Sequence, residues 1–149
     1  MISPTIIIRD PQRVPSEKIV DISTLAVVWN GRILLVKKKG QDFLILPGGK
    51  PEDCDRGNML ETMRREVREE LGVGVLQPSY IGTFLDEAGG APGVDVRVTL
   101  YGGWTDREPH PMAEIEDLVW TSIVGSTQKL APSLTNLILP HLAKIGNLS

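Results

Sequence analysis

The chain of 149 residues contains one cysteine, Cys54, so an internal disulfide bond is excluded, as is a zinc site built from several thiolates. This cysteine usage is typical of a reducing compartment, and we expect a cytoplasmic protein. No stretch approaches the run of about 18 apolar residues that a membrane-spanning helix requires, so we expect no membrane association. The N-terminal segment MISPTIIIRD lacks the basic start and cleavage site of a secretory signal.

Positive charge is also limited. The 16 Lys and Arg residues are outnumbered by 19 Asp and Glu residues, which gives a net charge of −3. Proteins that bind nucleic acids neutralise many phosphates with basic side chains, so we expect no nucleic-acid partner. A small anionic substrate is compatible with this charge, because a bound divalent cation reverses the local sign of an acidic pocket.

The length is typical of one domain with its own hydrophobic core. We predict a single domain over residues 1–149, with a core at about 20–145 and an N-terminal strand or arm at 1–19. Asn30 and Gly31 lie between two apolar runs, which predicts a hairpin between Ile22–Trp29 and Arg32–Lys39.

Further elements follow from the alternation of apolar and turn residues. Helices are predicted after Asn58 and over 134–145, where Pro140 should kink or split the last helix. Strands are predicted at four places: 43–50, 73–87, 94–104 and 113–123. This order of elements predicts an α/β fold in which helices pack on a mixed sheet.

The central helix combines a buried stripe with an unusual group of charges. Asn58 is a good N-cap and Gly72 a good left-handed C-terminal cap, and apolar residues recur between them at Leu60, Met63, Val67 and Leu71. Glu66 is followed by Glu69 and Glu70 after three and four residues, so the three carboxylates project from one side of the helix.

Two interpretations of these carboxylates are open. Charge runs usually mark a solvated helix face, on which neighbouring arginines offset the repulsion. A glycine turn just before the helix favours a metal site instead, because hard cations such as Mg²⁺ bind carboxylates, backbone carbonyls and phosphates. Arg65 lies four residues before Glu69 and is placed to pair with it and orient it.

The stretch REVREELGV, residues 65–73, resembles the second half of the Nudix box, Arg-Glu-U-x-Glu-Glu-x-Gly-U with U apolar, and agrees at every defined position. Gly48, Gly49 and Lys50 resemble the family's segment that leads into the box. Glu114 and Ile115 resemble a Glu-Ile pair that often follows it, so the likeness spans most of residues 20–145. The resemblance implies the Nudix fold, an α/β/α sandwich with a mixed central β-sheet.

The first half of the box departs from the family pattern, which is Gly, five residues, Glu, seven residues, Arg. Counting back from Arg65 places Gly57 at the glutamate position. Counting forward from Gly49 places Asp55 there, with nine residues before Arg65, which indicates a two-residue insertion. Glu52 and Asp53 are alternatives to Asp55 for the missing glutamate.

The resemblance also implies roles for residues. Glu66, Glu69 and Glu70, with the Gly49 carbonyl, would coordinate Mg²⁺ or Mn²⁺. One of these glutamates, or Glu114, would act as general base for the attacking water. The expected catalytic residues are therefore Arg65, Glu66, Glu69 and Glu114. The residues expected to contact the substrate are Gly48, Gly49, Lys50 and, on a strand face that would meet phosphate, Arg97.

The implied reaction is hydrolysis of a diphosphate linked to another group, usually a nucleoside. The motifs that sort the family by substrate are mostly missing, which favours a nucleoside triphosphate and leaves a nucleotide sugar or dinucleoside polyphosphate open. A Nudix-like ligand-binding or regulatory domain without hydrolysis is the alternative, because of the altered loop. Many relatives are dimers, so a homodimer is possible. Base stacking is a minor possibility for three tryptophans: Trp29, Trp104 and Trp120.

Overall fold

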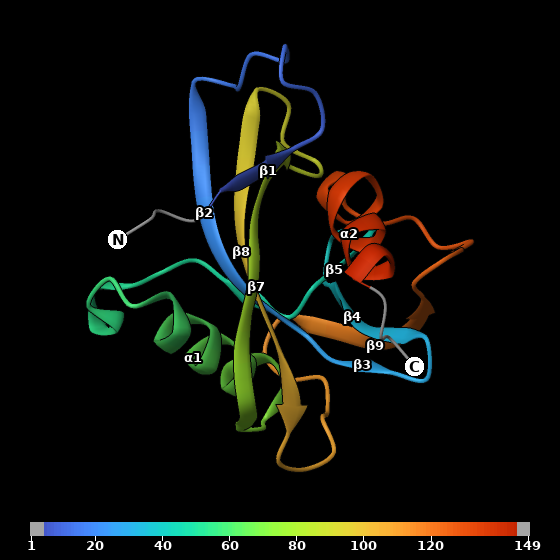
Figure 1. The fold of residues 1–149 in the computed structure, drawn as a ribbon. Coiled ribbons are helices and arrows are strands. Elements are labelled where there is room, and N and C mark those ends of the chain that lie inside the picture. The colour runs from blue at the N-terminus through green and yellow to red at the C-terminus, as the bar shows by residue number, and fades with distance from the viewer. Residues whose placement is uncertain (1–4, 146–149) are drawn as a thin grey trace.

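The computed structural model describes residues 5–145, which form two β-sheets flanked by helices (Figure 1). The first sheet contains five strands, β1 (Ile6–Ile8), β7 (Val75–Glu87), β8 (Val94–Thr105), β2 (Lys18–Ala26) and β6 (Gly48–Gly49), in that order. Parallel pairs join β1 to β7 and β2 to β8, whereas β7–β8 and β2–β6 are antiparallel. In the second sheet β4 (Arg32–Lys38) pairs with β3 (Val28–Trp29), β5 (Leu44–Ile45) and β9 (Ile115–Ser122).

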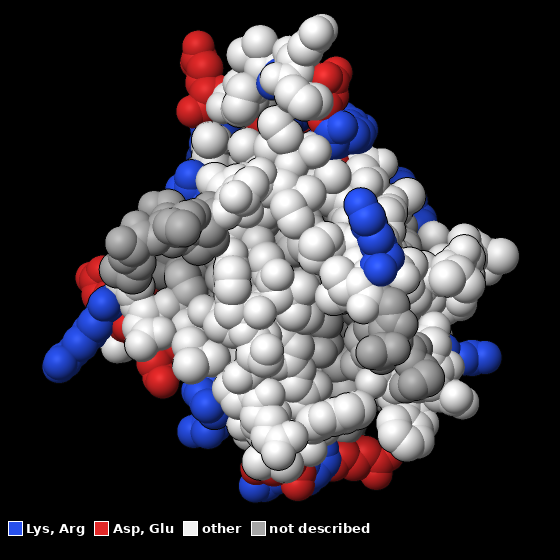
Figure 2. All heavy atoms as spheres, in the orientation of Figure 1, with Lys and Arg blue, Asp and Glu red and all other residues white. Residues whose placement is uncertain are grey.

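Helices lie on both sides of these strands. The α1 helix (Met59–Leu71) and the last helical segment, η2 (Leu134–Ile138) with α2 (Leu139–Ile145), are separated by the sheets in Figure 1. On the face drawn in Figure 2, most charged side chains lie along the rim and few lie across the middle. Within residues 5–145, no helix has the length and apolar character needed to cross a membrane.

The hairpin predicted at Asn30 and Gly31 is present, but the strand predicted before it is divided. Both turn residues adopt positive φ, 55° and 74°, as a tight hairpin turn requires. The predicted strand Ile22–Trp29 is corrected here: its first part belongs to β2, and only Val28–Trp29 pairs with β4 as β3. The chain passes from one sheet to the other at Val27, because the earlier residues pair with β8.

The α1 helix is anchored by the stripe and caps that the sequence predicted. The Asn58 side chain accepts hydrogen bonds from the backbone N–H groups of Leu60 and Glu61, at 3.0 and 3.3 Å. Gly72 ends the helix in the left-handed conformation. Three of the four stripe residues are fully buried against β2 and β4, namely Met63, Val67 and Leu71.

The C-terminal helix changes its pitch just before Pro140. The Leu139 N–H bonds to the carbonyl of Leu134, five residues earlier, so the first part is a π-helical turn. Proline has no N–H to donate and its ring crowds the carbonyl four residues back, which explains a change of pitch at this point. The segment still packs its apolar side against the space between the two sheets.

The glycine pair of β6 places the loop that precedes α1. Ser23 and Thr24 of β2 are the register partners of Gly49 and Gly48. Gly48 has φ of 146°, and a side chain at this position would overlap the Ser23 carbonyl oxygen. The close approach of two backbones therefore requires glycine, and it holds the glycine pair between β2 and the second half of α1, where Gly49 meets Glu66 and Gly48 meets Glu70.

Burial of the α1 stripe predicts a large effect of truncation on stability. Replacing Met63, which is fully buried, by Ala should lower the free energy of unfolding by about 2–5 kcal/mol, because the cavity left behind relaxes only in part. Met112 is 46% exposed, and Met112→Ala should cost less than about 0.5 kcal/mol. Urea unfolding monitored by circular dichroism compares the two, and equal losses would contradict the packing described.

Candidate active site

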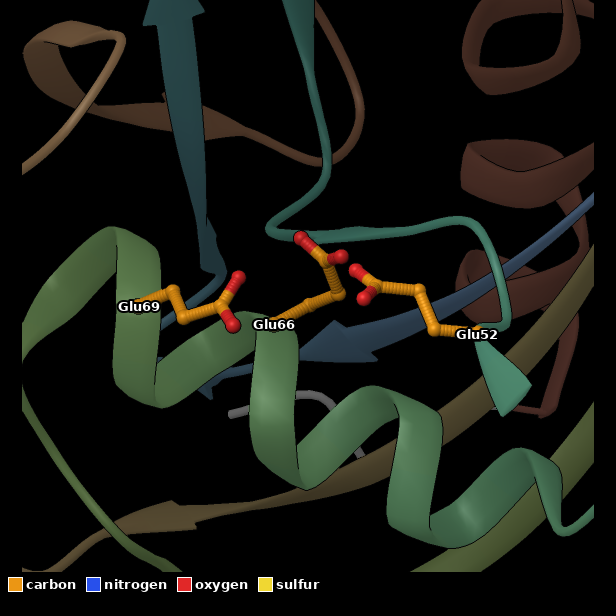
Figure 3. Close-up of side chains that lie close together, drawn as sticks. All are labelled: Glu52, Glu66 and Glu69. Carbon is orange, nitrogen blue, oxygen red and sulfur yellow. The ribbon is translucent and has the colours of Figure 1, made fainter. Parts of the chain in front are cut away.

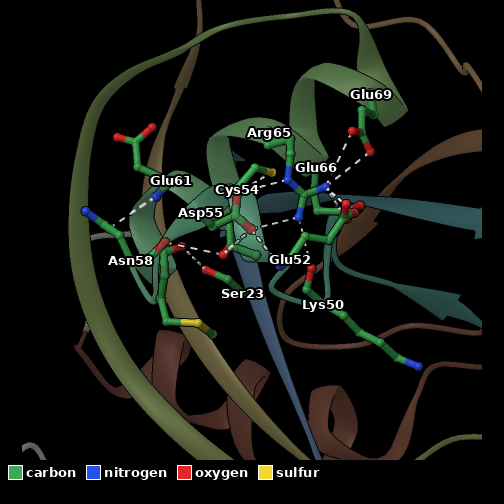
Figure 4. A network of polar contacts seen from close by, with 12 residues as sticks. Ser23, Lys50, Glu52, Cys54, Asp55, Asn58, Glu61, Arg65, Glu66 and Glu69 are labelled. Atoms are coloured by element: carbon green, nitrogen blue, oxygen red, sulfur yellow. Dashed lines mark hydrogen bonds and ion pairs between the residues drawn. The ribbon is translucent and has the colours of Figure 1, made fainter.

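Arg65 is the centre of a polar network between α1 and the loop before it (Figure 4). Its Nε and Nη2 atoms donate to the two oxygens of Asp55 at 3.0 and 2.9 Å, and Nη2 also donates to the Lys50 carbonyl at 3.0 Å. Its Nη1 atom contacts Glu66 at 2.8 Å and Glu52 at 2.9 Å. The guanidinium therefore binds these three carboxylates and one carbonyl, and the hydrogen bonds that it donates to Asp55 raise its pKa above the ordinary value for arginine.

Arg65 also contacts Glu69, one turn further along the helix. The Nη1 atom lies 3.4 Å from both oxygens of that carboxylate. This is the pairing predicted from the four-residue spacing, although the contact with Asp55 is shorter. The carboxylate of Glu69 therefore lies against Arg65 while 54% of its side chain is exposed.

Asp55 is the buried counterpart of Arg65. Besides the guanidinium, its oxygens accept from the Thr62 hydroxyl at 2.8 Å and from the Glu52 N–H at 2.9 Å. The hydrogen bonds from Arg65, first among these, hold the pKa of Asp55 well below its ordinary value. Of the three acidic residues considered for this position, Asp55 is buried and accepts two hydrogen bonds from Arg65. Glu52 makes one contact with Arg65 from an exposed position, and Asp53 is exposed.

The extra residues of the loop DCDRGN are accommodated by a short turn. Residues Asp53–Asp55 form one turn of 3₁₀ helix, after which Arg56 and Gly57 both adopt positive φ, 51° and 73°. Two consecutive left-handed residues reverse the chain and bring Asn58 to the N-cap of α1. The side chain of Asp55 is shorter than that of the glutamate in the family pattern, but it reaches Arg65 because the turn brings its backbone towards the helix.

Three carboxylates converge beside this network. Ligand oxygens of Glu52, Glu66 and Glu69 all lie within 4.8 Å of one another (Figure 3). Glu66 lies against Gly49 so closely that a Cβ at that position would come within 2.5 Å of the carboxylate carbon. Glu52 was not among the predicted metal ligands. The sequence analysis considered it only as an alternative to Asp55 for the missing glutamate of the box.

Glu70 lies one turn after Glu66 on α1 and is buried, with 1% of its surface exposed. Its Oε1 atom accepts from the Gly48 N–H at 2.9 Å, while Oε2 has no hydrogen-bond partner. Lys38 Nζ lies 3.9 Å from that free oxygen and 3.7 Å from Glu114 Oε1. Burial raises the pKa of Glu70 to about 7, against the opposing effects of the Gly48 hydrogen bond and Lys38.

These residues fit a divalent cation. Arg65 Nη1 contacts all three carboxylates and offsets part of their mutual repulsion, but one guanidinium leaves most of their oxygens free to bind a cation. A buried, unpaired carboxylate oxygen such as Glu70 Oε2 is costly without a partner. The tight contact between Gly49 and Glu66 also brings the loop backbone to the cluster. The donor set is therefore all oxygen, as Mg²⁺ and Mn²⁺ prefer.

A cavity of about 550 Å³ opens beside the cluster. It lies against β2, β8, the strands β5 and β6 and the η2 turn, and its charged lining consists of Lys38, Lys50, Glu52, Glu66 and Glu114. The rest of its wall is mostly aliphatic. Carboxylates and two lysines thus meet at one side of an apolar cavity, which suits a ligand with an anionic end and a less polar end.

A model of the NUDIX domain family matches residues 21–132. The chain belongs to the Nudix family. Two solved structures of this fold are a MutT NUDIX hydrolase from Burkholderia pseudomallei, which has 24% sequence identity and a TM-score of 0.67, and the ORF135 protein of E. coli, with 21% and 0.66. The first match covers 81% of this chain and 99% of that one, and the second 87% and 96%.

A third structure of the fold is a UDP-X diphosphatase, with 20% identity and a TM-score of 0.65 over 91% of this chain and 67% of that one. No curated protein sequence matches the chain. The Nudix fold and the hydrolase class predicted from the box are confirmed. Two sheets stand where the resemblance implied one central sheet, with helices on both sides as expected.

The Nudix domain brings most of the expected substrate-binding residues to the cavity, but Arg97 lies elsewhere. Gly48, Gly49 and Lys50 line the cavity. Arg97 instead donates to both oxygens of Asp21, at 2.6 and 2.9 Å, on the opposite face of the first sheet. Alternation along β8 sends its neighbours Val96 and Val98 into the cavity and Arg97 away from it.

The three tryptophans are also absent from the cavity wall. Trp29 and Trp104 contact each other edge to face, with ring centroids 6.2 Å apart, and are 65% and 44% exposed. The aromatic ring that does line the cavity is Phe43, which the sequence analysis did not single out. Phe43 was the first residue of the strand predicted at 43–50, and nothing in that short apolar run indicated that its ring faces a cavity.

The network predicts an acid-sensitive loop. Because the folded-state pKa of Asp55 is depressed, its ion pair stabilises the protein above the unfolded-state pKa, about 4, and this stabilisation is lost as the pH falls below it. Asp55→Asn should lower the melting temperature at pH 7 by several degrees. Between pH 5 and pH 3 the melting temperature of this variant should then fall less than that of the wild-type protein, because the variant has no ion pair left to lose.

Asp53→Asn is the matched control, since Asp53 is an exposed neighbour on the same turn. Differential scanning calorimetry at several pH values measures both variants. The same melting profile for Asp55→Asn and Asp53→Asn would show that the contact with Arg65 does not stabilise the loop.

Proposed function

We propose that this Nudix domain is a pyrophosphohydrolase that requires Mg²⁺ or Mn²⁺ and cleaves a nucleoside triphosphate. The observation that carries the proposal is the convergence of Glu52, Glu66 and Glu69, the first two of which line the cavity. The buried oxygen of Glu70, on the same helix, has no hydrogen-bond partner and supports it. Such a set of oxygens suits a cation that accompanies substrate phosphates.

The cation would be held by Glu66, Glu69 and Glu70 with the Gly49 carbonyl, and Glu52 is placed to join them. When bound, Mg²⁺ or Mn²⁺ neutralises phosphate oxygens and activates the attacking water. Arg65 acts by position: its hydrogen bond to Glu66 and its pair with Asp55 hold the carboxylates in place. Lys38 and Lys50, at the same side of the cavity, attract the phosphates.

Glu69 is the proposed general base. Glu66 already accepts a 2.8 Å hydrogen bond from Arg65, and Glu70 one from Gly48, whereas the contacts of Glu69 to Arg65 are long, at 3.4 Å. A carboxylate with free lone pairs can accept the proton of the water as its oxygen bonds to phosphorus. The P–O bond between the α- and β-phosphates breaks, the leaving group keeps the bonding electrons, and the products are a nucleoside monophosphate and pyrophosphate.

A nucleotide sugar is the second candidate substrate, since a UDP-X diphosphatase shares the fold. The cavity supports it less well. A hexose presents several hydroxyl groups that each require a partner when buried, and most of the wall is aliphatic. A nucleobase, with two apolar faces and a polar edge, matches such a wall better.

Hydrolysis should depend on Glu69. With Mg²⁺ and a panel of nucleoside triphosphates, UDP-glucose and dinucleoside polyphosphates, we expect pyrophosphate release from a triphosphate and a fall of about a hundredfold or more in kcat for Glu69→Gln. Glu61→Gln, an exposed glutamate on the same helix, is the control and should keep its activity.

The panel also decides between alternatives. A larger loss of kcat in Glu114→Gln than in Glu69→Gln would move the role of base to Glu114. If wild-type protein hydrolyses none of these compounds, the protein is the non-hydrolytic binding domain and the proposal fails.

Metal binding should depend on Gly49. A methyl group in Gly49→Ala would overlap the Glu66 carboxylate, so we expect Mn²⁺ binding, measured by titration calorimetry without substrate, to weaken about tenfold or more. Gly125→Ala is the control, because nothing lies within 4 Å of the added Cβ. Equal Mn²⁺ affinity in both variants would show that metal binding does not depend on the contact between Gly49 and Glu66.

A further inference from the structure

The loop between β7 and β8, residues 88–93, forms part of the cavity wall. Ala88, Gly89 and Ala91 line the cavity, and the ring of Phe43 lies so close to Gly89 that a Cβ there would come within 2.8 Å of a ring carbon. Three of the six loop residues are glycine, which gives the backbone many accessible conformations. The shape of this part of the wall therefore depends on the contacts that hold the two ends of the loop.

A fully buried carboxylate lies just after the loop. Asp95, the second residue of β8, is 0% exposed, and its neighbour Val96 lines the cavity from the other face of the strand. Arg13 donates to the two oxygens of Asp95 at 3.0 and 2.7 Å, and the N–H and hydroxyl of Ser16 donate at 3.2 and 2.9 Å. The Arg13 hydrogen bonds, first among these, lower the pKa of Asp95 to about 2. All four donors belong to residues 9–17, the β1–β2 connector, which runs past the end of the β7–β8 hairpin (Figure 1).

A second buried carboxylate, on β7, lies just before the loop and also pairs with the connector. Asp86 is 0% exposed, and Arg9 Nη2 lies 3.6 Å from its Oδ1 atom. Asn136 donates to the other oxygen of Asp86 at 2.8 Å. Asn136 belongs to η2, the turn that places Leu134 and Ile138 in the cavity wall. Both ends of the loop are therefore tied to cations of the connector, and one of them also to η2.

We propose that the β1–β2 connector completes the substrate cavity, and that Arg13 is a positioning residue that holds the loop 88–93 in place as part of its wall. A buried carboxylate that loses its cation is strongly unfavourable, so the strand ends that carry Asp86 and Asp95 would shift towards water and take the loop with them. The connector lies outside residues 21–132, the part of the chain that the family model matches.

The position of these contacts predicts an effect on binding rather than on the chemical step. The carboxylates proposed to hold the cation belong to α1 and the loop before it, whereas the connector contacts the ends of β7 and β8. A wall that has lost its supports must be ordered again by each ligand, which weakens affinity. This inference rests on the proposed hydrolysis of nucleoside triphosphates.

Arg13→Gln tests the proposal through steady-state kinetics, measured well below the melting temperature of each variant. For the triphosphate that the wild-type protein hydrolyses best, KM should rise about fivefold or more while kcat stays within about twofold. Arg13→Lys keeps the charge but not the two-pronged geometry, and its KM should lie between those of the wild-type protein and Arg13→Gln.

Arg97→Gln is the matched control. Arg97 projects from the same face of β8 as Asp95 and also binds both oxygens of an aspartate, but that aspartate, Asp21, belongs to β2 and not to the connector. Its KM should stay within about twofold of the wild-type value. An unchanged KM in Arg13→Gln, an equal rise in Arg97→Gln, or a loss confined to kcat would overturn the proposal.

Hydrogen exchange followed by mass spectrometry tests the same contact without substrate. The Ala88 N–H bonds to the Val94 carbonyl at 2.9 Å, and the Val94 N–H to the Ala91 carbonyl at 3.2 Å, so opening of the loop exposes both amides. Their exchange should be about tenfold faster in Arg13→Gln than in the wild-type protein or Arg97→Gln. If no triphosphate is hydrolysed, the proposed function fails and exchange alone decides: faster exchange in Arg13→Gln only supports the role of the connector, and equal exchange overturns it.

Discussion

The ion pair between Arg65 and Asp55 is the interaction on which the rest of the site depends. Two of the guanidinium nitrogens donate to the buried aspartate. The other contacts of Arg65 reach the Lys50 carbonyl and three glutamates, Glu52, Glu66 and Glu69. A planar group with five donors in fixed geometry can hold a loop and a helix together in this way, whereas a lysine could not. The loop is thereby fastened to α1, and its own glutamate lies beside those of the helix.

By holding the loop against α1, the Arg65 contacts bring several carboxylates together, and this is electrostatically unfavourable by itself. Glu66, Glu69 and Glu52 bring like charges together, and Glu70 is buried with one oxygen unpaired. Arg65 and Lys38 offset part of the repulsion, but burial still raises the pKa of Glu70. Sites that bind ions and reacting groups commonly keep such unfavourable electrostatics, because the ligand relieves it. The glycine pair contributes a second constraint, since any side chain at Gly49 would displace Glu66.

The cavity has a charged side and an aliphatic side. Charged groups occupy the side nearest α1, and valine, isoleucine and leucine side chains from β2, β8 and η2 form most of the remainder. The two sheets create this space because the chain crosses between them at Val27, so that β2 and β4 diverge instead of forming one hairpin. The same alternation of side chains that directs Val96 and Val98 inwards removes Arg97 from the site.

Much of this molecule could be predicted from local patterns in the sequence. The helix stripe, its caps, the Asn30-Gly31 turn and the box at residues 65–73 each depend on neighbours within one or two turns, so periodicity and spacing suffice. The place of Glu52 in the acidic cluster, the burial of Glu70, the direction of Arg97 and the role of Asp55 depend on contacts between segments distant in sequence. Sequence alone could count the residues between Gly49 and Arg65, but only the tertiary structure decided which carboxylate meets the guanidinium, because a single turn with two left-handed residues sets that geometry.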